Sequence, residues 1–238
     1  MILIEDLTVR FGGVVSLDGV RAELPVGTVG LIGPNGAGKT TLLNVLSGFV
    51  RPAAGRVVAF GEDLSGMPAH RRARWGVRRT FQTEQAIGAL SVAENVAMVH
   101  EHCGSGRRDR RAAVDRALEF TGLAGQRERP VAGLSAADRR CVELARAVVG
   151  RPRIILLDEP AAGLPEAETE RMRDAIREIP EQFGALTILV DHDMALVSAC
   201  CERAVVLDFG RVIASGPTAE VLQDDHVRRA YLGTEEVA

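Results

Sequence analysis

Lysine is almost absent from this chain of 238 residues, in which Lys39 is the only lysine among 29 basic side chains. Arginine therefore supplies the ordinary positive charge, and a compact ammonium on a flexible stem is kept for one position. GTPases bind guanine through an Asn-Lys-x-Asp motif and need a further lysine in their phosphate-binding loop. This chain has one lysine in all and cannot supply both. A GTPase is excluded on this ground.

Long apolar runs are also missing, because no stretch approaches the roughly 18 residues needed to cross a bilayer. The first residues, Met1 to Asp6, carry no basic region, so we expect no secretory signal and a cytosolic location. A net charge of −3 and a pI near 6.0 argue against nucleic acid as a partner.

Cysteine is scarce, and the four residues of this type show no paired spacing. Free, buried thiols are the simplest interpretation. His100, His102 and Cys103 lie close enough in sequence to suggest zinc, but a second ligand pair at a suitable spacing is missing. We therefore expect no metal site at these three residues.

A phosphate-binding loop is present and complete, because one run fits the template G-x-x-x-x-G-K-[S/T] without a mismatch. Its residues are Gly33, Pro34, Asn35, Gly36, Ala37, Gly38, Lys39, Thr40 and Thr41. An apolar strand at 29–32 precedes it and a helix-period run at 42–46 follows, as the motif requires. The flanks argue against the alternative of a chance glycine-rich turn.

The chemistry of the loop follows from its residue types. Glycines lack the Cβ that would block close approach, so backbone N–H groups can surround an oxyanion at a helix N-terminus. Lys39 adds a mobile positive charge, and the Thr40 hydroxyl is suited to bind Mg²⁺ beside a nucleoside triphosphate. The loop therefore predicts a nucleoside triphosphate and Mg²⁺ as ligands.

The rest of the chain alternates between strand and helix patterns. Strands are predicted at 2–10, 15–24, 56–60, 154–157 and 186–190, with a hairpin at 204–208 and 211–215, and helices at 91–100, 108–120, 135–149 and 166–179. The first two strands form an antiparallel lead-in, and the middle helices an insert. Five arginines surround Trp75 between His70 and Arg79; contact with anionic lipid is one interpretation, and a solvent-exposed face is the simpler one.

Polar side chains follow two further buried strands. Asp158 and Glu159 come directly after four apolar residues, and His192 lies just beyond the strand that ends at Val190. Strand ends after Ile32, Leu157 and Val190 are expected to converge at one edge of a mostly parallel sheet. Asp158 would hold Mg²⁺, Glu159 would orient and deprotonate water, and His192 would bond a γ-phosphate oxygen.

Taken together, these motifs resemble the ATP-binding subunit of ABC transporters over essentially the whole chain. The resemblance implies that Phe11 stacks on adenine, that Gln82 is the glutamine-loop residue with a catalytic and magnesium-binding role, and that Ser135 of the signature contacts phosphate. Asp158, Glu159 and His192 match the Walker B aspartate, the catalytic glutamate and the switch histidine. The branched-chain amino-acid branch is indicated by the segments 73–82, 90–95, 160–164, 192–194 and 230–233.

The same resemblance implies a domain organisation and partners. The P-loop NTPase core with its antiparallel lead-in would comprise residues 1–81 and 151–238, and the inserted helical subdomain residues 82–150. This subdomain would receive transmembrane permease subunits, with a substrate-binding protein acting indirectly. The chain would be cytoplasmic and peripheral on the inner face of the cell membrane.

The signature departs from the family pattern Leu-Ser-Gly-Gly-Gln, because residues 134–138 read Leu-Ser-Ala-Ala-Asp. Ala137 adds a methyl group where backbone should approach closely. At about 6 Å from a γ-phosphate charge and an effective dielectric near 20, Asp138 would cost roughly 3 kcal/mol per charge pair before screening. Pro165 replaces the usual D-loop aspartate. A heterodimer with a second ABC ATPase subunit is therefore favoured over a homodimer.

Two alternatives to a transport ATPase stay open. One is a nucleotide-binding regulatory or weakly hydrolysing subunit, motivated by Ala136, Ala137 and Asp138. The other is a non-transport ABC protein, although proteins of that kind usually carry two ATPase units in one chain or a long coiled-coil insertion. Measured ATP turnover, alone and with a partner subunit, separates the first alternative from an active ATPase.

Overall fold

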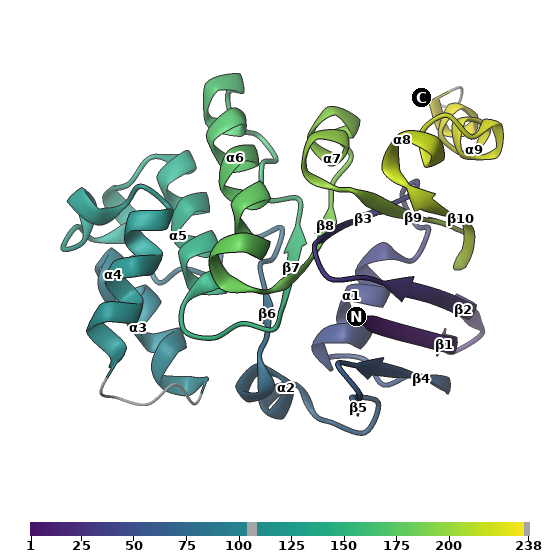
Figure 1. Ribbon diagram of the computed structural model, residues 1–238, viewed down its shortest axis with the longest axis horizontal. Coiled ribbons are helices and arrows are strands. Elements are labelled where there is room, and N and C mark those ends of the chain that lie inside the picture. The colour runs from purple at the N-terminus through teal and green to yellow at the C-terminus, as the bar shows by residue number, and fades with distance from the viewer. Residues whose placement is uncertain (104–108, 236–238) are drawn as a thin grey trace. The chain divides into compact units, whose positions relative to one another are not determined.

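Two compact units make up the computed structural model, which describes residues 1–103 and 109–235 (Figure 1). The first unit comprises Met1–Arg72 and Leu186–Ala238, and the second comprises Ala73–Ala185. The division predicted from the sequence, with a helical subdomain at 82–150, stays a prediction.

The first unit contains the predicted antiparallel lead-in. Its sheet has the order β2-β1-β4-β5, formed by β1 (Ile2–Phe11), β2 (Val14–Leu24), β4 (Ala54–Ala59) and β5 (Glu62–Asp63). β1 pairs antiparallel with both β2 and β4. The predicted alternation holds in two stretches of β1, with Ile2 and Ile4 buried and then Leu7 and Val9, on either side of a register shift.

A second, largely parallel arrangement in the first unit places the phosphate loop. β3 (Thr28–Ile32) pairs in parallel with β8 (Leu186–Val190) on one side and with β9 (Arg203–Asp208) on the other. β9 forms the predicted hairpin with β10 (Arg211–Pro217). The helices are α1 (Lys39–Ser47), α7 (Met194–Cys200), α8 (Thr218–Val221) and α9 (Asp225–Glu235). All residues of β3 and β8 are buried, which explains their unbroken apolar patterns.

The second unit combines a short parallel strand pair with helices. β6 (Val77–Arg79) pairs in parallel with β7 (Ile154–Asp158). The helices are α3 (Val92–His102), α4 (Arg110–Phe120), α5 (Ala136–Val148) and α6 (Glu166–Phe183), with 3₁₀ turns at Ala124–Gln126 and Val131–Gly133. The predicted insert is helical. The predicted end of α6 at residue 179 was wrong by a few residues, because the helix continues past Pro180 and ends at Gly184, which adopts a φ of 65°.

The arginine-rich stretch forms an exposed face only in part. Arg71 and Arg74 are exposed, as the simpler interpretation predicted, but Arg72 and Arg78 are buried, which it did not predict. The stretch folds into α2 (Ala69–Trp75) and β6, and Arg72 and Arg78 are only 1% and 5% exposed. Arg72 donates to the carbonyl oxygens of Met67 and Leu46 at 2.8 and 3.0 Å. Burial lowers the pKa of the Arg72 guanidinium. A buried arginine is tolerated here because backbone carbonyls at the end of α1 satisfy its donors.

The four cysteines lie apart from any cluster of metal-binding side chains in the described residues. Cys200 and Cys201 are buried, and all four cysteines are free thiols. Burial raises the pKa of the Cys141 thiol to about 11. Within residues 1–103 and 109–235, no three or more His, Cys, Asp or Glu side chains lie together in a way that could hold a metal ion. Over the same residues, no helix has the length and apolar character needed to span a membrane.

Candidate functional site

The phosphate loop leaves β3 at a point where only glycine fits. Gly33 has a φ of 148°, and a Cβ there would lie 2.1 Å from the carbonyl oxygen of Leu207. Gly38 has a φ of 105°, and a Cβ would lie 2.8 Å from both the Leu17 side chain and the Ser16 carbonyl oxygen. L side chains rarely adopt these conformations, and the space is filled by neighbouring chain. The two glycines therefore let the loop turn tightly between a buried strand and a helix.

Helix α1 begins at the loop with its N-terminus uncapped by a side chain. Its N-cap is Gly38, which makes no side-chain cap, and no acidic residue lies in the first turn. The ammonium of Lys39 donates to the carbonyl oxygens of Gly33 and Pro34 at 2.5 and 2.9 Å. A helix N-terminus with a lysine beside it is a favourable environment for phosphate oxygens.

The phosphate loop is held in place by hydrogen bonds to two neighbouring segments, at Gly210 and at Ser16. Ala37 is 2% exposed, and its carbonyl oxygen accepts a hydrogen bond from the N–H of Gly210 at 3.0 Å. The hydroxyls of Thr41 and Ser16 lie 2.7 Å apart. Asn35, Gly36 and Thr40 are exposed. The buried residues hold the loop's shape, and the exposed ones are available to a ligand.

The end of β8 lies at the same edge as the loop, which confirms part of the predicted convergence. β3 and β8 are parallel neighbours with Gly30 opposite Leu189, so Gly33 and Asp191 follow adjacent strand ends. Asp191 is 3% exposed, and its Oδ1 lies 3.7 Å from Nδ1 of His192, whose side chain is 74% exposed. His192 is therefore a surface side chain beside a buried carboxylate. Phe11, at the end of β1, is 51% exposed.

In the second unit, Asp158 ends β7 as a buried carboxylate. It is 2% exposed, and its Oδ2 accepts a hydrogen bond from Nη2 of Arg79 at 3.1 Å. Its backbone N–H donates to the hydroxyl of Thr80 at 3.1 Å. Arg79 and Thr80 were not identified from the sequence. The parallel pairing of β6 with β7, which sets Arg79 opposite Leu156, brings Arg79 and Thr80 close to the Asp158 carboxylate. No local sequence pattern predicts this pairing.

Glu159 adopts a backbone conformation that is uncommon for its residue type. Its φ is 50°, in the left-handed region. Non-glycine residues in this region carry strain of roughly 1 kcal/mol or more and are found frequently at functional sites. The strain accompanies an abrupt change of direction after the buried strand, where Glu159 emerges half-buried.

Gln82 lies on an exposed segment that is tied to helix α5. Nη1 of Arg140 donates to the Gln82 carbonyl oxygen at 3.1 Å, and Nε of Arg139 donates to Glu84 at 2.8 Å. The N–H of Gln85 donates to Oε1 of Glu143 at 2.7 Å, and Glu143 is 6% exposed. These contacts join the segment of Gln82 to the helix that follows the signature. The position of Glu143 on the apolar face of the amphipathic helix α5 is the one feature of the sequence that could have indicated these contacts.

The signature serine caps α5, as its sequence predicted. Oγ of Ser135 accepts a hydrogen bond from the N–H of Asp138 at 3.0 Å. Ala137 is 5% exposed, so its methyl group packs inside the chain, and the argument that this methyl blocks a partner was wrong. Ala136 is exposed and Asp138 half-buried. The departure from the family pattern therefore rests on Ala136 and Asp138.

A glycine-walled turn leading into an uncapped helix, with one lysine folded over it, defines a P-loop nucleotide-binding protein. The chain belongs to the ABC transporter family, whose model matches residues 17–162. A model described as "Branched-chain amino acid ATP-binding cassette transporter" matches residues 211–237. The chain is an ATP-binding subunit and an ATPase of this family, as its motifs predicted.

Curated relatives and a solved structure agree with this assignment. The chain is 37% identical to the high-affinity branched-chain amino acid transport ATP-binding protein LivG of Escherichia coli (strain K12), covering 98% of both chains. It is 35% identical to the corresponding protein BraF of Pseudomonas aeruginosa, covering 97% of this chain and 96% of that one. The ADP conformation of MJ1267, an ATP-binding cassette of an ABC transporter, has a TM-score of 0.87 at 27% identity and covers 98% of both chains. The predicted fold class is confirmed.

Proposed function

We propose that this subunit hydrolyses ATP to drive import of branched-chain or related amino acids, and that it works at the inner face of the cell membrane. The observation that carries the ATP-dependent part is the loop at Gly33 and Gly38, where a side chain would collide with neighbouring backbone. The substrate class is supported by the names of the LivG and BraF relatives. A non-transport ABC protein is disfavoured by the same relatives.

We assign the nucleotide to the residues of the phosphate loop, with Phe11 stacking on adenine and Ser135 serving the partner subunit's nucleotide. The oxygen donors suit magnesium, which prefers hydroxyl and carboxylate ligands. Thr40, Asp158 and Gln82 would hold Mg²⁺, which when bound neutralises charge on the β- and γ-phosphate oxygens. Asp158 is buried, and its carboxylate is already paired with the guanidinium of Arg79.

Glu159 is the general base in this proposal. It takes a proton from water as the water oxygen bonds to the γ-phosphorus, and the bond from that phosphorus to the bridging oxygen breaks. The electron pair leaves with ADP. His192 hydrogen-bonds a γ-phosphate oxygen, and Gln82 positions the water. The exposure of the His192 side chain, 74%, leaves it accessible to a ligand.

The test replaces the carboxylate of Glu159 while keeping its shape. Glu159→Gln should lower ATP turnover by about a thousandfold and leave ATP affinity within a few-fold of the parent, because only the base is lost. Glu178→Gln, on the exposed face of α6, is the matched control and should turn over normally. Turnover that survives in Glu159→Gln would overturn the assignment of the base. Leucine uptake by vesicles that hold the assembled transporter tests the substrate class.

A heterodimeric assembly fits the altered signature. In this family the signature of one subunit closes over ATP bound to the other. Asp138 would place negative charge toward that ATP, although its N–H is held by Ser135. We therefore propose that this chain hydrolyses ATP at its own loop and serves its partner's site poorly. Asp138→Gln should raise turnover only at the partner's site, so an increase retained when the partner's catalytic glutamate is replaced would contradict the proposal.

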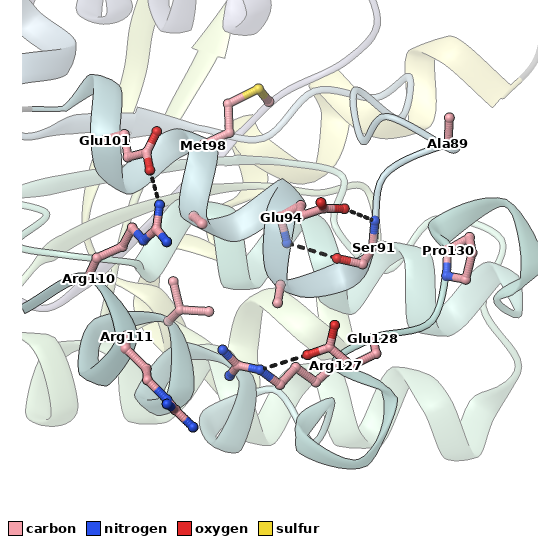
Figure 2. A pocket seen from close by; sticks show the side chains of 13 residues that line it. Ala89, Ser91, Glu94, Met98, Glu101, Arg110, Arg111, Arg127, Glu128 and Pro130 are labelled. Carbon is pink, nitrogen blue, oxygen red and sulfur yellow. Dashed lines mark hydrogen bonds and ion pairs between the residues drawn. The ribbon is translucent and has the colours of Figure 1, made fainter. Parts of the chain in front are cut away.

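We further assign permease docking to a mixed-charge groove of about 870 Å³ in the second unit (Figure 2). The groove is lined by Ala89, Ser91, Ala93, Glu94, Ala97, Met98, Glu101, Arg110, Arg111, Val114, Arg127, Glu128 and Pro130. Ser91 and Glu94 form a capping box that fixes the start of α3. Arg110 pairs with Glu101, and Arg127 pairs with Glu128 at 3.2 Å. A rigid groove with balanced charge suits a helical segment of a permease subunit.

Substitution within the groove tests this assignment. Ala97→Arg should abolish co-purification with the permease subunits of the transporter, while ATP binding stays unchanged. Ala219→Arg, at an exposed position of α8, is the control and should co-purify normally. Normal co-purification of the Ala97→Arg protein would refute docking at the groove.

A further inference from the structure

A second cavity of the second unit, which we name the arginine cavity, takes no part in the functions described above. It has a volume of about 800 Å³. It is lined by Arg74, Trp75, His100, Cys103, Asp109, Ala112, Ala113, Arg116, Gly150, Arg151, Arg153 and Phe183. This volume lies within the range of small-molecule sites, about 300–1,000 Å³.

Charge in the arginine cavity is strongly one-sided. Four guanidinium groups, those of Arg74, Arg116, Arg151 and Arg153, line it, and Asp109 is the only acid among the lining residues that the structure describes. Arg74, Arg116 and Arg151 form no ion pair with any residue that the structure describes; Arg116 donates a hydrogen bond to the neutral carbonyl oxygen of Gln182. Positive charges gathered in a concave surface repel one another and attract an anion. The positive charge of these three guanidinium groups is therefore not neutralised by acids in the described part of the unit.

The mixed-charge groove provides a comparison within the same unit. Its arginines are neutralised by acids, as in the pairs of Arg110 with Glu101 and of Arg127 with Asp115 (Figure 2 labels the first pair). Three arginines of the arginine cavity lack such partners. Both cavities are lined in part by α3 and α4. They differ in whether acids lie beside their arginines.

Aromatic rings hold two of the cavity's guanidinium groups in place. Cζ of Arg153 lies 3.9 Å from the ring centroid of Trp75, and Cζ of Arg116 lies 5.1 Å from that of Phe183. Phe183 is itself fixed by an edge contact with Phe120, with ring centroids 4.9 Å apart. Stacking on an aromatic face orients a guanidinium and leaves donors at its edge for an oxyanion. These two side chains are preorganised.

His100 adds a buried polar group to the wall of the arginine cavity. It is 1% exposed, and its Nδ1 has no hydrogen-bond partner in the described part of the chain. A buried imidazole without a partner costs free energy, and a bound acceptor would recover it. Burial lowers the pKa of His100, so without a ligand the ring tends to be neutral. A bound anion would favour its protonated form.

We propose that the arginine cavity binds a phosphate-bearing polyanion at a site separate from the phosphate loop. A phosphate group carries two charges and three acceptor oxygens on one centre, which suits several arginine forks at once. The remaining volume and the apolar wall of Ala112, Ala113 and Phe183 leave room for the organic part of the molecule. Its source is either a soluble organic phosphate or the head group of an anionic phospholipid.

Calorimetry with inorganic pyrophosphate tests the proposal on the full chain. Lys39→Ala is carried by every protein compared, so that the phosphate loop contributes little, and no ADP is added because ADP is itself a phosphate-bearing polyanion. We expect one pyrophosphate per chain, and a loss of affinity of about tenfold or more in Arg116→Gln/Arg151→Gln, because each residue loses charge-assisted hydrogen bonds. Both side chains are exposed, so the fold should be retained. Arg177→Gln, an exposed arginine of α6 outside the cavity, is the matched control and should bind as the parent does.

A second arm separates the two sources of phosphate. Flotation with phosphatidylcholine vesicles, with and without phosphatidylglycerol, measures recruitment by lipid head groups. Recruitment that depends on Arg116 and Arg151, without pyrophosphate binding, would assign the site to lipid; pyrophosphate binding without recruitment would assign it to a soluble ligand. Failure of both, or equal binding by the double variant, would overturn the proposal. Movement of the His100 ring resonance on titration, assigned with His100→Gln, reports the same site independently.

Discussion

The phosphate loop and the arginine cavity both present positive charge to an anion, but they are built in opposite ways. The loop uses backbone N–H groups, glycines and one lysine within nine consecutive residues, Gly33 to Thr41. The arginine cavity uses charged side chains drawn from positions between Arg74 and Phe183. A backbone site must be continuous and needs glycine at fixed places, so it leaves a readable motif. A site built from side chains needs neither consecutive residues nor glycines at fixed positions, so it leaves no motif in the sequence.

The largest expected effect comes from adding one methyl group to the loop. Gly33→Ala would place a Cβ 2.1 Å from the Leu207 carbonyl oxygen at a φ of 148°, so the loop must move. We expect ATP affinity, measured with a fluorescent nucleotide, to fall by about a thousandfold, equivalent to about 4 kcal/mol. Gly61→Ala, with a φ of 84° and open space around the Cβ, carries the backbone strain alone and should leave affinity unchanged. Equal losses in both variants would mean that strain, and not the collision, is responsible.

The next effect concerns a site that the sequence announced only in part. Arg79→Met removes the partner of Asp158 in a pair whose side chains are 6% and 3% exposed. Breaking a buried pair from one side should lower the free energy of unfolding by about 3 kcal/mol, measured by urea denaturation. Arg21→Met breaks a pair whose side chains are 75% and 61% exposed and should cause little change. Comparable stability of both variants would show that Arg79 does not support Asp158.

Exchanging the two kinds of cation sharpens the comparison further. Lys39→Arg places a planar, bulkier group where an ammonium contacts two carbonyl oxygens at 2.5 and 2.9 Å. ATP affinity should fall by about thirtyfold. The reverse exchange, Arg151→Lys in the arginine cavity, keeps the charge and should weaken pyrophosphate binding only about threefold. A larger loss in the cavity than in the loop would contradict the view that the loop is the geometrically stricter site.

The smallest effect is a pH dependence centred on His100. Burial lowers its pKa below the ordinary value of 6.5, with Asp109 and Glu101 opposing the shift and Arg110 and Arg78 reinforcing it. The unfolded chain therefore binds a proton more readily than the folded one. Stability is full above pH 6.5 and falls as the pH drops through the folded pKa. The free energy of unfolding of His100→Gln should lack this decline, and saturating pyrophosphate should reduce it in the parent. An unchanged decline in His100→Gln would assign it to another group.

The predictability of the fold follows from how its information is distributed along the chain. Buried strands such as β3 and β8 carry unbroken apolar runs, and Ser91 and Ser135 mark helix starts, so these elements could be predicted. α2 and β6 were missed because arginine dominates their sequence, although Arg72 and Arg78 are buried. Charged side chains are normally exposed to solvent, but Arg72 and Arg78 are buried against carbonyl oxygens, those of Leu46 in α1 for Arg72 and of nearby Ala73 and Val77 for Arg78.

Site residues divide in the same manner. The loop, Asp158, Glu159 and His192 follow strands directly, and their positions could be proposed from sequence order. Arg79 could not, because the partner of its guanidinium lies 79 residues further along the chain. Arg139, Arg140 and Glu143, which tie the segment of Gln82 to α5, were missed for the same reason. Pairings across long separations depend on strand register and helix packing.

The solitary lysine also makes the protein unusually simple to observe. In a chain supplied with ¹⁵N-lysine, one side-chain ammonium would carry the label, because Lys39 is the only lysine. Its Nζ donates to the carbonyl oxygens of Gly33 and Pro34, contacts that must change when phosphate oxygens arrive. A single magnetic resonance signal could thus follow the filling and emptying of this ATPase's loop in the intact transporter, without interference from any other side chain of its kind in this subunit.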